Sequence, residues 1–365
     1  MKKITLLISS LAGGGAEGVC VNIANALAKR GWKVDLVVLN LNKESYLNRL
    51  NEQVNLVVLG VTQARHAPTN LLRYLKENNI GMMLVFNYEL AVITIILRIV
   101  FRLKFKVIAR NINTISKICD SSSGRWQSYV VKPLIKKFYS KVDHVVNQCH
   151  AMRNDLLSIF PQLDLRSSVI YNPVAKHVEE YTKDLVFNYN KENYILCVGR
   201  LEKQKAFHHA IDVFSRLQYT YPDLRLKIVG IGSLENELKE LAIKLDVANK
   251  VDFEGFRENM IPYYLGAKLT LLTSLYEGFP NVLIESITLG TPVVAFDCQS
   301  GPREIITKYN GVLVENGNVE KLEHAISMLL KETISSSSII ESAEKYKMDV
   351  IVNEWENLIL NVQEN

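Results

Sequence analysis

The sequence has few cysteines, and none of them is arranged to bind metal. Its five cysteines, Cys20, Cys119, Cys149, Cys197 and Cys298, lie far apart in 365 residues and form no C-x-x-C pair. Structural zinc sites and disulfide-rich small domains both need closely spaced cysteines. The spacing excludes a cysteine-based zinc site and a dense disulfide framework, and it is typical of a reducing compartment.

No stretch is apolar for long enough to cross a bilayer, which takes about 20 residues. The nearest candidate, residues 90–101, is interrupted by Arg98 and followed by Arg102, Lys104 and Lys106. Residues 4–16 begin like a signal peptide, but their apolar run of about six residues is too short for one. The sequence therefore predicts a cytoplasmic protein.

Nucleotide-cofactor signatures are also missing. The glycine loop Gly13-Gly14-Gly15 joins a first apolar run to a helical pattern and lets a ligand approach the backbone closely. It has no G-x-G-x-x-G spacing, no acidic residue at the dinucleotide position and no Walker lysine. Hydride transfer and ATP hydrolysis are therefore disfavoured.

Acidic residues are scarce in the first half of the chain. Residues 1–180 carry 24 Lys and Arg against 12 Asp and Glu, whereas the remainder carries 19 against 26. The overall charge of +5 hides this imbalance. A basic half indicates an anionic partner, such as nucleic acid, an acidic lipid surface or a phosphorylated substrate.

Short apolar runs of strand length alternate with helical patterns along the whole chain. They lie at residues 4–9, 34–39, 54–59, 82–86, 106–109 and 144–147, and again at 194–199, 226–230, 251–255, 269–273, 292–296 and 311–314. Near-continuous apolar runs are typical of strands covered on both faces of a parallel sheet. The pattern predicts an α/β protein with two doubly wound, Rossmann-like domains in tandem.

The two series are separated by a pause near Asn172-Pro173, and polar residues 174–192 are interpreted as a linker. The predicted domains are therefore residues 1–175 and 176–345. Residues 346–365 carry an amphipathic helical pattern that includes Trp355. We expect this helix to return to the first domain, because its apolar face needs a partner.

The clearest chemical signal is a pair of acids that follows the strand at 269–273. Glu277 lies in the loop after the strand, and Glu285 lies about one turn into the next helix. Two carboxylates at this spacing can accept hydrogen bonds from two polyol rings, while the helix N-terminus attracts a phosphate or a sugar oxygen. The structural alternative is a surface acid followed by a capping acid.

Basic residues follow the first strand of the second series. Arg200 and Lys205 come directly after Gly199 and can converge on a diphosphate. Two solvated surface charges are the alternative. Gly230 and Gly232 follow the next strand, and a plain turn explains them better than a phosphate loop does.

In this order and spacing, the motifs resemble the retaining family-4 glycosyltransferases of GT-B architecture. The resemblance covers nearly the whole chain: GGGAE at 13–17, NPV at 172–174, VGRLEKQK at 198–205, VGIGSLENELKELA at 229–242, VDFEGF at 251–256, EGFPNVLIE at 277–285, SGPREI at 300–305 and GVLVENGN at 311–318. It implies two Rossmann-like domains that face a central cleft, with the acceptor bound to the first domain, residues 1–175, and the donor nucleotide sugar bound mainly to the second, residues 176–345.

The resemblance also implies roles for individual residues. Arg200 and Lys205 would hold the donor diphosphate and stabilise it as the leaving group, and Glu277 would contact the donor sugar. Further substrate contacts are implied for Glu285 at the ribose, Arg257 at the nucleobase, Phe279, Pro280 and Asn281 beside the sugar and phosphate, and Gly14 and Gly15 over the diphosphate.

One position departs from the family pattern. Many relatives carry a histidine after the strand at 106–110, where this sequence has Asn111, and we expect Asn111 or Arg110 to take its place. Fixed cations and helix amides can stabilise a departing diphosphate without a metal. No D-x-D motif is present and the seven histidines show no ligand spacing, so we expect metal-independent transfer with no cofactor.

The resemblance favours UDP-GalNAc, UDP-GlcNAc or UDP-Gal as donor and a lipid-diphosphate-linked saccharide as acceptor, in bacterial polysaccharide, lipopolysaccharide or O-antigen synthesis. The basic first half suits peripheral binding to the anionic inner face of the cell membrane. Two alternatives remain: another GT-B enzyme, such as a nucleotide-sugar epimerase, and a non-catalytic basic module that binds nucleic acid or membrane. Neither explains Arg200, Lys205, Glu277 and Glu285 together, and we expect no nucleic-acid partner.

Overall fold

A computed structural model describes residues 2–42, 46–112, 114–116, 127–183, 191–332 and 334–364. The chain folds as two compact units. Unit 1 contains Met1–Ala175 and Met348–Asn365, and unit 2 contains Lys176–Lys347. Each unit has its own parallel sheet and its own hydrophobic core.

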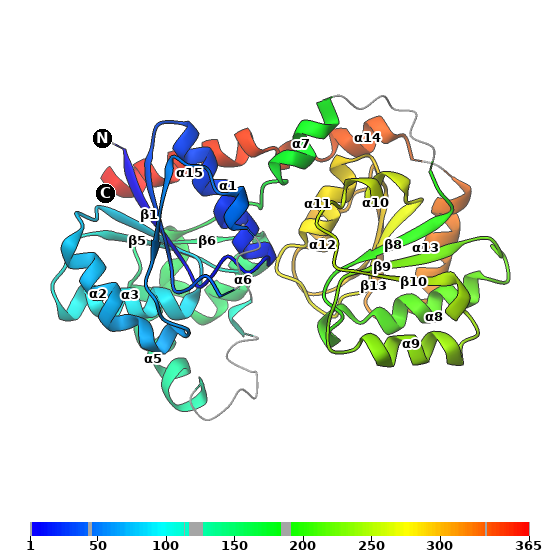
Figure 1. Ribbon diagram of the computed structural model, residues 1–365, viewed down its shortest axis with the longest axis horizontal. Helices are drawn as coiled ribbons and strands as arrows, with labels where there is room; N and C mark the ends of the chain where they lie inside the picture. Colours follow the sequence, from blue (N-terminus) through cyan, green and yellow to red (C-terminus); the bar gives the residue numbers. More distant parts are fainter. Residues whose placement is uncertain are drawn as a thin grey trace. The chain divides into compact units, whose positions relative to one another are not determined.

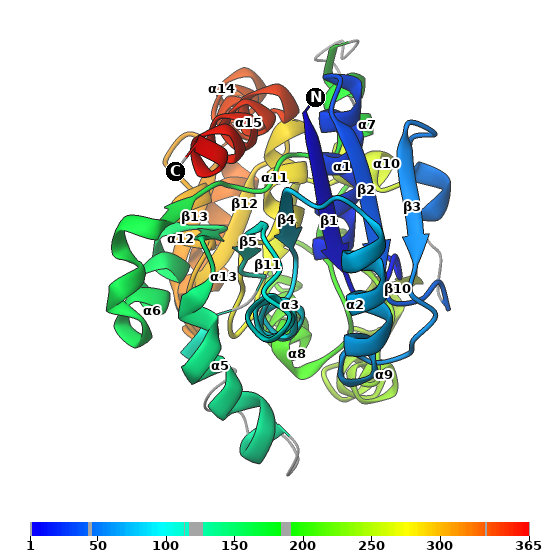
Figure 2. The same cartoon turned by 90° about the vertical axis from the view of Figure 1, so that its left-hand side faces the viewer.

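The sheet of unit 1 has seven parallel strands. Their spatial order is β3 (Val54–Val58), β2 (Lys33–Val38), β1 (Lys3–Ile8), β4 (Met82–Val85), β5 (Lys106–Arg110), β6 (His144–Asn147) and β7 (Ser167–Val169). Figure 2, which looks onto unit 1, shows β3, β2, β1 and β4 in this order from right to left. The order reverses between β1 and β4, as it does in doubly wound sheets.

Helices cover both faces of this sheet. They are α1 (Gly15–Lys29), α2 (Ala67–Glu77), α3 (Tyr88–Val100), α5 (Lys132–Phe138), α6 (His150–Ile159) and α15 (Met348–Glu364). In β1, Ile4, Leu6 and Ile8 pack toward α1 and α15, whereas Leu7 packs toward α2 and α3. Successive side chains of a strand point to opposite faces, so a continuous apolar run serves both cores.

Helix α15 packs against α1 in unit 1, which confirms the predicted return of the C-terminal helix (Figure 1). Trp355 is fully buried in the core between α15 and the sheet. Polar contacts also fix α15: Glu356 accepts hydrogen bonds from Arg30 Nη1 and Trp32 Nε1, both at 2.7 Å. The helix is therefore an integral layer of unit 1.

The sheet of unit 2 repeats the doubly wound order with six parallel strands. They are β10 (Val251–Gly255), β9 (Arg225–Val229), β8 (Tyr194–Val198), β11 (Leu269–Leu272), β12 (Val293–Asp297) and β13 (Gly311–Glu315). Its helices are α7 (Lys176–Lys183), α8 (Phe207–Leu217), α9 (Glu235–Lys244), α10 (Ile261–Gly266), α11 (Asn281–Thr288), α12 (Pro302–Ile305), α13 (Val319–Lys331) and α14 (Ser336–Glu341). The order of this sheet reverses between β8 and β11.

Part of the predicted linker is helical, which corrects the sequence-based interpretation. Helix α7 occupies residues 176–183 and contacts α11, and its Val178 is buried. Residues 184–190 lie outside the described part of the chain.

Two further expectations concern cysteines and membrane spans. The side chains of Cys20, Cys149, Cys197 and Cys298 are buried, and Cys119 lies outside the described residues. Across the described ranges, no helix is long and apolar enough to span a membrane.

Candidate functional site

The carboxyl ends of β8 and β11 mark the point in unit 2 where the strand order reverses. Ligands of open α/β sheets bind in the crevice at such a point. The loops that follow the two strands are joined by hydrogen bonds: Leu275 N donates to Gln204 O at 2.9 Å, and Gln204 Nε2 donates to Tyr276 O at 3.0 Å. Residues from the two predicted motifs are thereby held together.

Lys205 and Glu277 form an ion pair between these loops. Lys205 Nζ lies 2.6 Å from Glu277 Oε1, and the two side chains are 14% and 8% exposed. Ser274 Oγ donates to the same carboxylate oxygen at 2.6 Å, and Thr273 Oγ1 donates to Lys205 O at 3.0 Å. The structure thus brings together a cation and an acid that are 72 residues apart.

Glycine is required where the chain leaves β8. Gly199 has φ +153°, and a Cβ there would lie 2.9 Å from Lys205 Cε. A Cβ on Gly230, which follows β9, would lie only 1.9 Å from Gly199 O. The two strand-end turns therefore pack backbone against backbone. Gly230 supports the loop that carries Lys205, which explains the glycine without assigning it to a phosphate loop.

Arg200 lies on the same loop but differs from Lys205 in its surroundings. It is exposed, and among the described residues its side chain makes no hydrogen bond or ion pair. The neighbouring Glu202 instead accepts hydrogen bonds from Ser233 N at 3.0 Å and Ser233 Oγ at 2.9 Å. These bonds lower the pKa of Glu202. The convergence of Arg200 with Lys205 on a diphosphate stays a prediction.

Helix α11 begins directly after the Glu277 loop. Phe279 and Pro280 are buried, and the ring of Phe279 lies 5.8 Å from that of Tyr346, edge to face. Asn281 is the first helical residue, and no side chain caps the helix. The N-terminus of a helix carries partial positive charge and favours an anion. Phe279, Pro280 and Asn281 thus place such an end beside Glu277.

Glu285 is positioned by a residue that the sequence motifs do not indicate. Tyr264 Oη, from α10, donates to Glu285 Oε2 at 3.0 Å. Tyr264 is fully buried, and burial together with the nearby carboxylate raises its pKa well above the ordinary value. The phenol therefore stays protonated and holds one oxygen of Glu285 in place.

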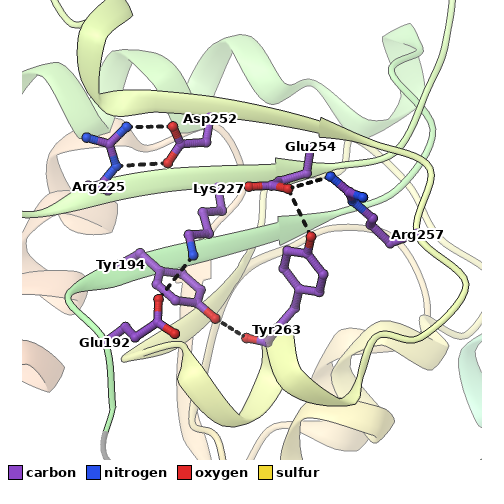
Figure 3. A network of polar contacts seen from close by, with 8 residues as sticks. All are labelled: Glu192, Tyr194, Arg225, Lys227, Asp252, Glu254, Arg257 and Tyr263. Atoms are coloured by element: carbon purple, nitrogen blue, oxygen red, sulfur yellow. Dashed lines mark hydrogen bonds and ion pairs between the residues drawn. The ribbon is translucent and has the colours of Figure 1, made fainter.

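Arg257 lies past the carboxyl end of β10, the edge strand that pairs with β9. Figure 3 shows Glu254 accepting from both Arg257 Nη2 at 3.0 Å and Tyr263 Oη at 2.9 Å. The Gly230 amide donates to Gly255 O at 2.8 Å, so the Arg257 turn is tied to the glycine turns described above. Its contact with a nucleobase stays a prediction.

In unit 1, Gly14 and Gly15 are exposed at the start of α1, at the carboxyl end of β1. A Cβ on Gly14 would lie 2.4 Å from Glu17 Oε2, so the acid of the same turn covers this backbone. The loop is accessible, as a role beside a diphosphate requires. That role itself stays a prediction.

Asn111 belongs to a buried polar network. It is 4% exposed, its Nδ2 donates to Asn147 Oδ1 at 2.7 Å, and Tyr139 Oη donates to its Oδ1. Gln148 Nε2 also donates to Asn111 O at 3.0 Å. In this arrangement the amide organises the loops after β5 and β6. The predicted contact between Asn111 and the donor sugar stays a prediction.

Arg110, the other candidate for the missing histidine, is 1% exposed. Its Nη2 donates to Asn172, its guanidinium lies 5.2 Å from the centre of the Phe86 ring, and Nε and Nη1 have no protein partner. Burial lowers its pKa to about 10. Arg110 thus connects β5 to the segment that leaves unit 1.

Within the described ranges, no group of three or more His, Cys, Asp or Glu side chains could hold a metal ion. The residues that surround the candidate site supply hydroxyl groups and single acids. Metal independence stays a prediction.

Sequence reasoning missed two partners in unit 2. Ser274 lies three residues before Glu277, and a hydroxyl at that spacing in a strand-end loop could have been noticed. Tyr264 lies 21 residues before Glu285, on a different helix, and no local sequence pattern predicts its contact with Glu285.

Comparison with known proteins identifies two family matches that together span most of the chain. Residues 13–177 match the family described as "Glycosyltransferase Family 4". Residues 179–346 match the family described as "Glycosyl transferases group 1". The two matches coincide closely with the two folding units.

Two relatives align along nearly their full length. The amylovoran biosynthesis glycosyltransferase AmsD of Erwinia amylovora is 27% identical over 368 residues, covering 98% of this chain and 100% of that protein. The N-acetylgalactosamine-N,N'-diacetylbacillosaminyl-diphospho-undecaprenol 4-alpha-N-acetylgalactosaminyltransferase of Campylobacter jejuni is 29% identical over 345 residues, covering 91% of each.

Among solved structures, Anabaena HepE in complex with UDP superimposes with a TM-score of 0.75 at 19% identity, covering 99% of this chain and 100% of that one. This likeness confirms the predicted two-domain fold.

Proposed function

Because the chain belongs to the family-4 glycosyltransferases of GT-B fold, we propose that it is a retaining transferase that extends a lipid-linked saccharide in cell-surface polysaccharide synthesis. Its donor is a UDP-sugar that carries GalNAc, GlcNAc or galactose. The observation that carries the proposal is the Lys205–Glu277 ion pair at the switch point of unit 2.

The ion pair suits a donor whose leaving group is a diphosphate. When the glycosidic bond breaks, negative charge develops on the departing phosphate oxygen. Lys205 supplies a fixed positive charge on a loop held by hydrogen bonds from Thr273 and Leu275. A preorganised charge of this kind stabilises the transition state without reorganising at the moment of reaction.

Glu277 and Glu285 then contact different parts of the donor. Glu277 lies beside Lys205 and can accept hydrogen bonds from the sugar, while the positive end of α11 faces the phosphate. Glu285 lies about one turn into α11 and is held by Tyr264, as a hydrogen-bond acceptor for ribose hydroxyls should be. Arg200 and Arg257 complete the diphosphate and base contacts.

The relatives support the choice of substrates. The Campylobacter protein is named for transfer of N-acetylgalactosamine to a diphospho-undecaprenol saccharide, and AmsD is named for amylovoran biosynthesis. HepE is solved with UDP. We extend these substrate classes to this chain: a UDP-sugar donor and a lipid-diphosphate-linked acceptor.

An acceptor on a lipid carrier requires the enzyme to reach the membrane, at its cytoplasmic face. Helix α5 packs against α3, and the segments 99–106 and 127–141 contain no Asp or Glu. Their exposed residues mix cations with apolar groups: Ile99, Val100, Phe101, Arg102, Lys104, Tyr129, Lys136, Lys137 and Lys141. Each such cation contributes about 1 kcal/mol near an anionic surface.

Membrane binding is tested by vesicle flotation. Vesicles that contain phosphatidylglycerol should carry the protein, and neutral vesicles should not. Lys136→Glu combined with Lys137→Glu should weaken flotation, whereas Lys239→Glu in unit 2 should leave it unchanged. Equal binding by all three proteins would contradict this surface.

The donor is tested first by thermal shift with UDP, GDP and ADP. A ligand at 100 times its Kd adds about 2.7 kcal/mol, which shifts the melting temperature of a 172-residue unit by roughly 5 to 10 °C. Stabilisation by UDP alone supports the proposal. Stabilisation by none of the three nucleotides contradicts it.

Turnover is then measured with labelled UDP-sugars and bacterial membranes, followed by analysis of the lipid-extracted product. Anomeric NMR of the product tests retention, and activity in EDTA tests metal independence. Release of a free epimerised UDP-sugar without transfer would instead indicate an epimerase.

A further inference from the structure

The sequence motif SGPREI, residues 300–305, contributes no residue to the candidate site. It forms the turn that follows β12 and the short helix α12, which packs against α11 (Figure 1). Just before the motif, the backbone of Gln299 pairs with that of Tyr276 in an isolated parallel bridge, and Glu277 N donates to Gln299 O at 3.3 Å. The motif therefore adjoins the loop that carries Glu277.

Gly301 lets the motif pack directly on the backbone of this loop. A Cβ on Gly301 would lie 2.6 Å from Pro280 Cδ and 2.9 Å from Gly278 O, so any larger residue would have to displace the loop. Gly301 has φ +57°, and the neighbouring Ser300 has φ +74° although it is not a glycine. Strained backbone of this kind persists only where the surrounding structure holds it in place. The turn is therefore a fixed support for the loop.

Tyr346 contacts the same loop through its ring. It is fully buried, and its ring lies 5.8 Å from that of Phe279 at an interplanar angle of 62°. Its hydroxyl donates to Glu304 O, in α12, at 3.2 Å, and Lys345 Nζ donates to the same oxygen at 3.1 Å. Tyr346 thus joins the loop, at Phe279, to the motif, at Glu304.

The residues that are held in this way connect the two chemical features of the loop. Residues 278–280 lie between Glu277 and Asn281, where α11 begins. A shift of these residues would move the Glu277 carboxylate and the positive end of the helix together. Such shifts affect chemistry strongly, because a misplacement of about 1 Å can cost about 10² in rate.

We propose that Gly301 and Tyr346 are positioning residues of the donor site, which hold Glu277 and the start of α11 in the geometry that the donor sugar requires. Both are buried, and they act through residues 278–280. The inference rests on the proposed function, which makes a donor sugar the ligand of this loop. It assigns a role to the SGPREI motif and to Tyr346, which lies two residues before α15 begins.

The glycine contact is tested with two matched variants. Gly301→Ala places a Cβ against Pro280 and Gly278, whereas Gly317→Ala, in the turn after β13, meets no atom within 4 Å. Gly317 has φ +77°, so alanine is strained at both positions. We expect Gly301→Ala to lower kcat for sugar transfer by about 10- to 100-fold and Gly317→Ala to keep the wild-type kcat.

The ring contact is tested at Tyr346 itself. Tyr346→Leu removes the ring that faces Phe279 and should lower kcat to a similar extent. Tyr346→Phe keeps the ring, loses only the hydrogen bond to Glu304 O, and should retain most of the activity. The control is Tyr221→Leu: Tyr221 Oη also donates to a backbone carbonyl, that of Ser327 at 3.4 Å, but Tyr221 precedes β9, at the amino end of the sheet. This control should melt at a lower temperature and keep the wild-type kcat.

Two further measurements separate positioning from a general loss of structure. UDP has no sugar for Glu277 to contact, so in Gly301→Ala and Tyr346→Leu the fall in kcat should exceed the fall in UDP affinity measured by calorimetric titration. Hydrogen exchange of the amides at 277–283 reports on the loop without any turnover. Exchange there should be faster in these two variants than in the wild type and in the two controls.

Wild-type kcat in both Gly301→Ala and Tyr346→Leu would overturn the inference, and so would equal losses of kcat in Gly317→Ala and Tyr221→Leu. If Gly301→Ala does not fold, the tyrosine variants decide the question by themselves. A wild type that neither binds UDP nor transfers sugar would overturn the proposed function instead. Hydrogen exchange would then still decide whether the two residues position the loop: unchanged exchange at 277–283 in both variants would refute it.

Discussion

Replacement of Lys205 by methionine tests the candidate site most directly. Methionine keeps the apolar stem of the side chain and removes the charge that faces Glu277 at 2.6 Å. Breaking a buried pair leaves one charge uncompensated and costs about 3 to 5 kcal/mol. The Glu277 carboxylate is only 8% exposed but keeps its hydrogen bond from Ser274, so we expect the lower end, about 3 kcal/mol.

The chain offers a matched control in the same unit. Lys239 and Glu235 form an ion pair with the same 2.6 Å distance, but their side chains are 49% and 36% exposed. Such surface pairs contribute about 0.3 to 0.5 kcal/mol. Calorimetry of unit 2 should therefore show a fall of roughly 6 to 12 °C for Lys205→Met and of about 1 °C for Lys239→Met.

Catalysis and stability separate in the double variant. Lys205→Met should lower kcat by about 10² to 10³, the usual effect of removing one group that stabilises developing charge. Adding Glu277→Gln removes the unpaired carboxylate, so the double variant should regain most of the lost stability and stay inactive. Wild-type turnover in Lys205→Met would refute the reasoning, and so would equal melting temperatures for Lys205→Met and Lys239→Met.

Three further predictions follow from individual residues. Burial lowers the pKa of His144 to about 4, below its value of about 6.5 in the unfolded chain. Between these two values the unfolded state binds more protons, so the free energy of unfolding should fall as the pH drops from about 6.5 to 4. Urea titrations across that range should show this fall, and His144→Gln should reduce it. Tyr264→Phe should weaken UDP binding about tenfold in calorimetric titration, because Glu285 loses the hydrogen bond from the Tyr264 hydroxyl. Trp355→Ala should destabilise unit 1 by about 3 to 5 kcal/mol in thermal melts and leave the stabilisation by UDP intact. If the variant lost both the stability of unit 1 and the stabilisation by UDP, the two units would not act separately.

Apolar runs predict most strands because both faces of these sheets are covered. The run at 144–147 coincides with β6, and that at 311–314 differs from β13 by one residue. Strand β7 is missing from the prediction: it has three residues, two of them serines, and pairs only with β6 at the edge. An edge strand this short carries no apolar signal.

The site was predictable where chemistry follows a strand directly. Lys205 and Glu277 come from motifs at the ends of β8 and β11, and parallel strands bring such ends together. Tyr264 was not predictable, because its hydroxyl reaches Glu285 only through the packing of α10 against α11.

The position of α15 in the chain has a consequence for biosynthesis. A ribosome completes all of unit 2 before it makes the helix that carries Trp355 and covers α1. Nascent domains normally fold in the order of their synthesis. Here unit 1 cannot be completed until unit 2 has been made, and until then the apolar face that α15 covers stays exposed. We therefore expect stalled or shortened chains to bind chaperones, even though their unit 2 is already complete.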